Sequence, residues 1–418
     1  MRRFLSWLTG RREPQPKQSA PQPDTAATGP TRFALDLYME LKDYVGPYEN
    51  VVCAPFAVSL ALASIHAGAR GRTADQLEHV LACAAAEGPW QSALTGLRAR
   101  LTAVAEKEGF VLGLAHGLWA PAGLPLLKTF RKAVEQSYGA AVTQADFSQE
   151  EPARTLINQW LREATRQLLD TVVARGELTP EARLVLIAAL CFKGYWATPF
   201  DAQQTLDEPF WVNPHAKIVA PMMWQHARFA YGQFPFHFAD RLQVLELPFA
   251  GKELSLVLLL PEGIEGIIEL EHTLGRQKGK LPAWLGELQR REIEVVLPKF
   301  AFASRFNMGE TLGELGPVDA FSPQDADFTG MRSERDVSLS HVFHQVLVAI
   351  DEYGADFAPA AGDGSGTARP DRATPRPVPM FRADHPFLFL IRDRVSGQIV
   401  FMGRVMNPGV APKLNFVL

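Results

Sequence analysis

The chain has 418 residues, of which 47% are apolar and 21% charged, so it can bury a large core in one big domain or in two to three ordinary ones. Its 42 basic and 46 acidic residues give a net charge of −4, which argues against a nucleic acid or an anionic membrane surface as partner. Three cysteines, Cys53, Cys83 and Cys191, lie far apart in apolar surroundings and predict buried free thiols rather than a disulfide framework.

The N-terminal residues 1–30 combine a basic start with a very short apolar stretch around Phe4, Trp7 and Leu8. A secretory signal needs roughly 7–15 apolar residues, more than this segment offers. We expect a disordered Pro/Gln-rich tail here, and a short interfacial anchor is the alternative. The sequence contains no run of about 18 apolar residues, so we expect no helix that spans a membrane.

Apolar periodicity predicts the elements in chain order. The first half reads as a helix near Phe33, a strand and helix within Val51–Ile65, a helix from Thr73, a strand over Val111–Trp119, a helix over Ala153–Leu169 and a strand over Leu184–Phe192. The second half reads mainly as strands, at Leu242–Phe249, Leu254–Leu260, Ile293–Phe302, Val342–Ile350, Phe387–Arg392 and Ile399–Val405.

Helices therefore dominate the first half and strands the second, without regular βαβ alternation. This order predicts an α+β fold with mixed sheets rather than a doubly wound one. We expect a single domain over residues 31–408 and a C-terminal tail over 409–418. Asp351–Pro379 interrupts the strands with almost thirty small, polar and Pro-rich residues. A structureless segment of that length is usually a functional loop, a linker or a disordered insertion.

No sequence motif for catalysis or cofactor binding is present: G-x-S-x-G, H-E-x-x-H, a phosphate-binding loop and C-x-x-C are all missing. Ser365, flanked by glycines, has no strand or helix around it to hold a nucleophile. His341 and His344 lie three apart in a predicted strand, so they point to opposite faces and do not share a metal. We expect neither cofactor nor metal, and no enzymatic activity.

Short motifs spread over residues 31–408 resemble one family. They include Asn50-Val51-Val52 with Pro55, Ala67-Gly68-Ala69-Arg70-Gly71, Phe192-Lys193-Gly194-Tyr195-Trp196, Leu297-Pro298-Lys299-Phe300, Asp384-His385-Pro386-Phe387 and Phe401-Met402-Gly403-Arg404. Each motif is weak, but together and in this order the chain is similar to the serpins, and we expect a bacterial-type member.

The resemblance implies three β-sheets, about nine helices and an exposed reactive-centre loop at about residues 354–380. Serpins offer this loop to a protease as bait. After cleavage, its N-terminal part inserts as a new central strand of the main sheet while the protease is held as an acyl-enzyme, a bistable switch that stores its driving energy in the native state.

The hinge of such a loop must enter a central strand. Glu352 and Gly354 match the hinge of the family, and Ala355 is small where Thr or Ser is usual. Phe357 stands where the family prefers Ala, and overpacking typically costs about 1–3 kcal/mol. Pro359 lacks an N–H and removes a ladder hydrogen bond. These two residues predict slow insertion, which favours a substrate over an inhibitor.

The resemblance also assigns residues beneath the main sheet, the shutter, and at its top, the breach. The shutter comprises the buried His344 with Ala54, Ala57 and Ala188, three alanines that replace the usual polar partners of the histidine. A buried imidazole without partners costs about 1–3 kcal/mol unless another group serves. The breach comprises Lys193 and Trp196, in the segment where insertion begins.

Two bonds compete as the reactive bond. Counting from Gly354 as the family does gives Ala368–Arg369, which suits a protease with a small primary pocket. A trypsin-like protease would instead cut Arg372–Ala373, because the other arginines of the loop precede proline. The second choice lengthens the inserted arm by four residues and adds slack.

Three functions remain open: a monomeric inhibitor of an elastase-like or trypsin-like serine protease, a non-inhibitory serpin that serves as a substrate, binding or storage protein, and an enzyme with an unrelated insertion. The first two differ in whether Phe357 and Pro359 permit insertion. The third lacks any catalytic constellation. Location also stays open, since the family often implies an extracellular protein and the weak N-terminus a cytoplasmic one.

Overall fold

The structure of the chain is a computed structural model that describes residues 29–81, 90–107, 110–236, 240–353 and 378–409. These residues form ten α-helices, one short 3₁₀ helix and fourteen strands. The helices are α1 (Gly29–Val45), α2 (Pro55–His66), α3 (Gly71–Val80), α4 (Trp90–Ala105), α5 (Lys128–Tyr138), α6 (Glu150–Ala164), η1 (Ala202–Gln204), α7 (Gly266–Arg276), α8 (Lys280–Gly286), α9 (Gly309–Leu315) and α10 (Val318–Phe321).

The strands alternate with these helices and dominate after residue 206. They are β1 (Val51–Cys53), β2 (Phe110–Pro121), β3 (Ala141–Ala145), β4 (Leu184–Gly194), β5 (Leu206–Asn213), β6 (Ala216–Pro235), β7 (Arg241–Pro248), β8 (Leu254–Pro261), β9 (Gln289–Pro298), β10 (Phe300–Asn307), β11 (Leu339–Ile350), β12 (Met380–Arg382), β13 (Phe387–Asp393) and β14 (Ile399–Val405).

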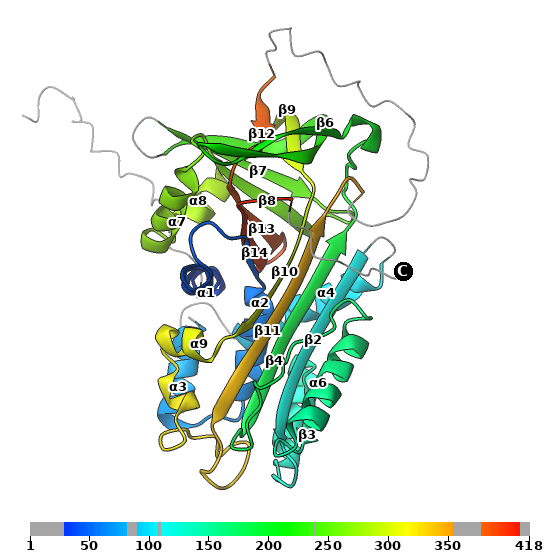
Figure 1. The fold of residues 1–418 in the computed structure, drawn as a ribbon. Coiled ribbons are helices and arrows are strands. Elements are labelled where there is room, and N and C mark those ends of the chain that lie inside the picture. Colours follow the sequence, from blue (N-terminus) through cyan, green and yellow to red (C-terminus); the bar gives the residue numbers. More distant parts are fainter. Residues whose placement is uncertain (1–28, 82–89, 108–109, 237–239, 354–377, 410–418) are drawn as a thin grey trace, which may run out of the picture.

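A five-stranded sheet with the order β10-β11-β4-β2-β3 occupies the lower part of the molecule in the view of Figure 1. Its central pair is parallel: β11 lies against β4 from Leu339↔Leu184 to Val348↔Phe192. The outer neighbours of this pair, β10 and β2, run antiparallel to it. We call this the main sheet.

The second sheet has nine strands in the order β1-β14-β13-β8-β7-β6-β9-β12, with β5 also on β6. The twenty-residue β6 pairs first with β5, over residues 216–222, then with β9, over 222–231, and with β7 at its end. The family resemblance implies that these strands belong to two sheets. Here hydrogen bonds along β6 join them into one continuous sheet. The predicted α+β class with mixed sheets is confirmed.

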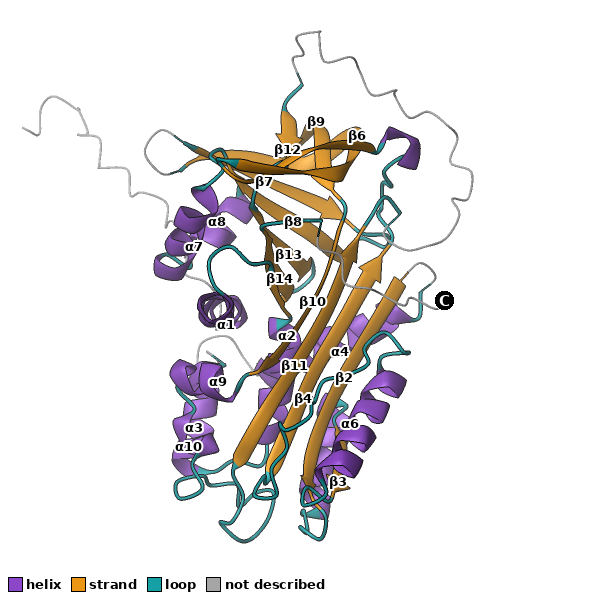
Figure 2. Cartoon of the chain, in the orientation of Figure 1, coloured by secondary structure: helices purple, strands orange, loops and turns teal. Residues whose placement is uncertain are grey.

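Strand β4 is buried on both faces, and its residues alternate between two cores. Leu186, Ala188 and Leu190 belong to the large core that contains α2. Val185, Ile187 and Ala189 belong to a smaller core with Ile157 and Leu161 of α6 and with Val172 and Val173 of the following segment. Figure 2 shows α6 on one side of the main sheet and α2 on the other.

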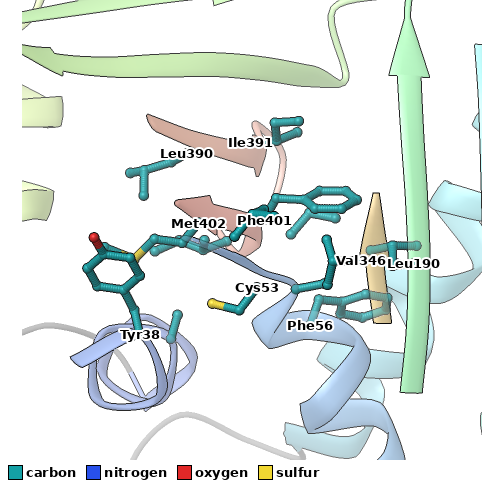
Figure 3. Close-up of a cluster of buried hydrophobic side chains, with 14 of the residues drawn as sticks. Tyr38, Cys53, Phe56, Leu190, Val346, Leu390, Ile391, Phe401 and Met402 are labelled. Carbon is teal, nitrogen blue, oxygen red and sulfur yellow. The ribbon is translucent and has the colours of Figure 1, made fainter. Parts of the chain in front are cut away.

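The large core ties the main sheet to the second sheet. Figure 3 shows Phe56 of α2 and Val346 of β11 in one cluster with Phe401 of β14. These side chains have relative exposures between 0% and 2%, so a movement of β11 disturbs contacts that reach the second sheet.

Two predicted element bounds are wrong. The apolar run Ile293–Phe302 is not one strand, because the chain passes from β9 in the second sheet to β10 in the main sheet at Lys299. Pro298 and Lys299 mark the crossing in the sequence, but the buried apolar residues on both sides of them favoured the prediction of a single strand. Helix α6 ends at Ala164 instead of Leu169, because Arg166 and Gln167 adopt φ of 53° and 66°, outside the helical range.

Candidate functional site

The end of β11 is held by three residues of the loop that follows it. Asp351, Glu352 and Tyr353 precede the undescribed residues 354–377 and contact the top of β4 and the segment after it. The backbone N–H of Phe200 donates to the carbonyl of Glu352 at 3.0 Å, and that of Trp196 donates to the carbonyl of Tyr353 at 3.3 Å. The chain after Ile350 is therefore pinned before the long segment begins.

Trp196 packs this attachment from the side. Its indole ring stacks on Phe249 with centroids 4.6 Å apart and lies edge-on to Phe200 at 5.9 Å. Its Nε1–H donates to the carbonyl of Asp351 at 2.7 Å, so the buried indole has the partner that it needs. Trp196 reports directly on whether Asp351 is in place.

Two ion pairs add charge-assisted contacts. Lys193 Nζ at the end of β4 lies 2.9 Å from Asp351 Oδ2. Glu352, 5% exposed, accepts from Lys299 Nζ at 2.8 Å and from Thr205 Oγ1 at 2.8 Å. Lys299 is the residue at which the chain crosses between the two sheets, so Glu352 links the loop to both. Removing one partner of a buried pair leaves an uncompensated charge, which is strongly destabilising.

His344 of β11 is fully buried, and both ring nitrogens have partners. Nδ1 donates to the carbonyl of Ala188 on β4 at 2.7 Å, and Nε2 accepts from the backbone N–H of Ala54 at 3.0 Å. Burial lowers the pKa of His344 to about 4, so the ring is neutral near pH 7. Backbone groups thus serve in place of the missing polar side chains, because Ala54 immediately precedes α2 and Ala188 faces His344 across the sheet.

Ala57 has no polar role in this arrangement. It lies in α2 with 1% exposure and contributes to the large core. Ala54, Ala188 and His344 therefore meet at one point. Ala57 lies in the first turn of α2, the helix that Ala54 precedes.

Sequence reasoning missed a second buried histidine in the same row of the main sheet. His116 of β2 pairs with Ala188, as His344 does from the other side. Ser64 of α2 lies 3.1 Å from His116 Nε2, and its hydroxyl also donates to the carbonyl of Ala61. Burial lowers the pKa of His116 to about 4. The alternation of β2 indicates which face His116 occupies, but only the strand order brings it into line with His344.

The far end of the loop segment is attached to the second sheet. Strand β12 pairs in parallel with β9, and the N–H of Glu294 donates to the carbonyl of Pro379 at 3.0 Å. Arg382 contacts Glu208 and Asp384, and His385 Nε2 lies 2.7 Å from the carbonyl of Pro261. Residues 354–377 consequently connect two separate sheets.

Many residues of the predicted site lie outside the described part of the chain. These are the hinge residues Gly354, Ala355, Phe357 and Pro359 and the reactive-bond residues Ala368, Arg369, Arg372 and Ala373. Glu352, Lys193 and Trp196 come together at the top of the main sheet, whereas His344, Ala54 and Ala188 meet halfway down it.

The described residues offer no metal-binding cluster. No group of three or more His, Cys, Asp or Glu side chains there is arranged to hold a metal. Cys53 and Cys191 are buried free thiols, as predicted, and burial raises the pKa of Cys191 to about 12, while Cys83 lies outside the description. Over the same ranges, no helix is long and apolar enough to cross a bilayer.

Comparison with known proteins identifies the family. Residues 28–408 match the family model described as serpin (serine protease inhibitor). The leukocyte elastase inhibitor of Homo sapiens is 35% identical over 391 residues, covering 90% of this chain and 98% of the relative. An uncharacterized serpin-like protein of Thermococcus kodakarensis is 34% identical over 381 residues, covering 90% of this chain and 84% of the relative. The chain belongs to the serpin family.

Solved structures agree with this assignment. Uncleaved ovalbumin superimposes with a TM-score of 0.80 at 27% identity, covering 91% of this chain and 99% of ovalbumin. Serpin48, described as a highly specific serpin of the insect Tenebrio molitor, gives a TM-score of 0.77 at 27% identity, covering 91% of this chain and 97% of that structure. The relatives named here are animal and archaeal and do not support a bacterial-type assignment.

Proposed function

We propose that this chain inhibits a serine protease as a suicide substrate. The protease attacks a bond in residues 354–377, and the cleaved arm inserts between β4 and β11 before the acyl-enzyme is hydrolysed. The protein supplies no catalytic group and needs no cofactor, because its own contribution is a change of conformation.

The observation that carries this proposal is the parallel pairing of β4 and β11 at the centre of an otherwise mainly antiparallel sheet. A segment that turns back after Ile350 runs antiparallel to both strands. Its insertion therefore replaces one parallel ladder by two antiparallel ones, which are slightly more stable per residue. Glu352, Lys193 and Trp196 hold the turning point at the top of this pair, and we assign them to the hinge and breach.

Strand length favours Ala368–Arg369 as the reactive bond. An arm from Gly354 to Ala368 extends about 46 Å at 3.3 Å per residue, somewhat longer than the roughly 36 Å of β11. An arm that ends at Arg372 is about 13 Å longer still and leaves slack. Small residues before the bond fit an elastase-like protease, in keeping with the similarity to the human leukocyte elastase inhibitor. Arg372–Ala373 and a trypsin-like target are the second choice.

The alternative is a non-inhibitory serpin that is cleaved without trapping its protease. Phe357 and Pro359 favour it, since a proline in a strand paired on both sides removes a ladder hydrogen bond. The parallel pairing of β4 and β11 is compatible with both functions. The rate at which the cleaved arm inserts therefore decides between them.

Incubation with an elastase-like and a trypsin-like protease tests the proposal. An inhibitor gives a complex that survives SDS, and mass spectrometry of the released C-terminal peptide identifies the cleaved bond. We expect a monomeric serpin that forms a one-to-one complex. Cleaved serpin alone at every ratio of protease to serpin would establish the substrate function instead.

A further inference from the structure

A cleft of about 870 Å³ opens at the end of the main sheet opposite to the hinge. It lies among the end of α1, helices α9 and α10 and the starts of β4 and β11, elements that Figure 2 labels. Its apolar lining includes Tyr44, Val318, Phe321 and Leu339. Tyr44 is 75% exposed and Val318 58%, values rare for large apolar side chains in the described part of the chain.

The cleft is also acidic. Glu181 and Glu310 line it without an ion-pair partner among the described residues, and Asp336 at its edge is paired with Arg332. Arg183 is the one basic side chain of the described lining. Nearby on α1, burial and then the adjacent carboxylates of Asp43 and Glu314 raise the pKa of Glu40. An occupant that suits the cleft is apolar and basic.

The sequence contains a segment of that character in Met1–Glu13, M-R-R-F-L-S-W-L-T-G-R-R-E. Phe4, Leu5, Trp7 and Leu8 form an apolar centre between two pairs of arginines, and the segment has a single acidic residue. Its charge and its large apolar side chains complement the exposed Tyr44 and Val318 and the unpaired carboxylates of the cleft.

The connection is long enough. Twenty residues separate Leu8 from Gly29, the start of α1, and span up to about 70 Å when extended. Tyr44 lies near the other end of α1, about 25 Å away along a helix of 17 residues. A flexible chain of twenty residues has a root-mean-square span of about 25 Å, so the tether suits the distance.

We propose that Met1–Glu13 docks in this cleft, with the aromatic side chains against Tyr44 and Val318 and the arginines facing Glu181 and Glu310. The occupied cleft bridges the start of β4, through Glu181 and Arg183, and the start of β11, through Leu339 to His341. If the proposed function holds, the docked segment also restrains the separation of these two strands and slows loop insertion.

Binding in trans tests the docking without reference to inhibition. A fluorescein-labelled peptide of residues 1–13 is titrated with a chain that starts at Ala27, and anisotropy is recorded. We expect saturable binding that weakens at least fivefold between 50 and 300 mM salt. The full-length chain binds the peptide at least tenfold more weakly, because its own segment occupies the cleft.

Matched variants locate the binding surface. Val318→Arg weakens peptide binding at least tenfold, whereas Val395→Arg, at a valine in the turn before β14 that is 70% exposed against 58% for Val318, leaves it unchanged. Equal binding to both variants overturns the proposal, as does no binding to the shortened chain. Two further outcomes also overturn it: a dimer of the shortened chain that Val318→Arg abolishes, and full-length protein that binds anionic vesicles through residues 1–13 while its cleft remains open to the peptide.

Discussion

The backbone N–H of Ala54 donates a 3.0 Å hydrogen bond to Nε2 of His344, joining the start of α2 to the middle of β11. Because the opposite ring nitrogen donates to Ala188 on β4, one imidazole links three elements that must separate when a strand enters the main sheet. This contact between the three elements is thus built from one side chain and two backbone groups.

Acid should destabilise the native protein through its buried histidines. His116 and His344 have pKa values of about 4 in the fold against an ordinary 6.5, so the unfolded chain binds more protons between these values. Their contribution is complete above pH 6.5 and is lost as the pH falls towards 4. The loss is about 1.4 kcal/mol per pH unit for each histidine. Urea unfolding midpoints from pH 7.5 to 5 measure it.

Variants separate this effect from other titrations. The double variant His116→Asn, His344→Asn should show a flatter decline of the urea midpoint between pH 6.5 and 5. We expect it to be less stable than the parent at pH 7.5. His66 and His341, whose pKa values burial also lowers, leave a residual slope. An unchanged slope in the double variant would contradict the assignment.

Replacing His344 by alanine removes the acceptor of the Ala54 N–H and one donor to the Ala188 carbonyl. Each buried unsatisfied group costs about 1–3 kcal/mol, so we expect a marked fall in the melting temperature. His215→Ala, at an exposed turn, is the control and should leave it unchanged. A small effect of His344→Ala would mean that water replaces the ring.

The pair formed by Glu352 and Lys299 should restrain the hinge. Lys299→Met leaves a nearly buried carboxylate unpaired and is expected to be more damaging than Glu352→Gln, which retains an acceptor for Thr205. The double variant should recover part of the loss, with a coupling of about 1 kcal/mol because Lys299 is 39% exposed. Thermal melting of all four proteins completes the cycle, and strictly additive losses would show that the pair does not act as a unit.

Trp196 should report hinge movement. Its indole loses the bond to Asp351 when the hinge enters the sheet, so cleavage in the loop should shift its emission to longer wavelength. The chain has eight tryptophans, and therefore the difference between the parent and Trp196→Phe isolates this signal. The same change on cleavage in both proteins would place its source elsewhere.

Loop composition should set the balance between inhibitor and substrate. Phe357→Ala and Pro359→Ala together remove a bulky side chain and restore a ladder donor, so insertion should accelerate. We expect the fraction of protease trapped as SDS-stable complex to rise severalfold. Ala361→Pro, which adds a proline to the same arm, is the opposing control and should increase the yield of cleaved serpin.

Sequence patterns predicted the long apolar strands and the family, since strands such as β4 and β11 read clearly from continuous or alternating apolar residues. They did not separate β9 from β10, because the break at Pro298 and Lys299 is only two residues long and has apolar residues on both sides. The predicted end of α6 was also wrong, because the helix is ended by the positive φ angles of Arg166 and Gln167 and not by a change in hydropathy.

The site was predictable in part. Motif order indicated His344, Lys193, Trp196 and Glu352, but not their contacts. His116 was invisible, because its place beside Ala188 depends on the order of strands that are far apart in the chain. The partners of His344 were also hidden, since a backbone N–H and a backbone carbonyl are present at every residue and leave no trace in sequence.

Strand β4 contributes side chains to two hydrophobic cores, one on each face of the main sheet, and this affects how fast β4 can separate from β11. Parting it from β11 loosens the packing against α2 and against α6 together, so the barrier collects contributions from both sides at once. A barrier made largely of apolar contacts carries a large activation enthalpy at warm temperatures. Separation of β4 from β11 without cleavage of the loop should consequently be slow at ambient temperature and accelerate steeply on warming. The lifetime of the uncleaved protein should therefore shorten sharply with each rise in temperature.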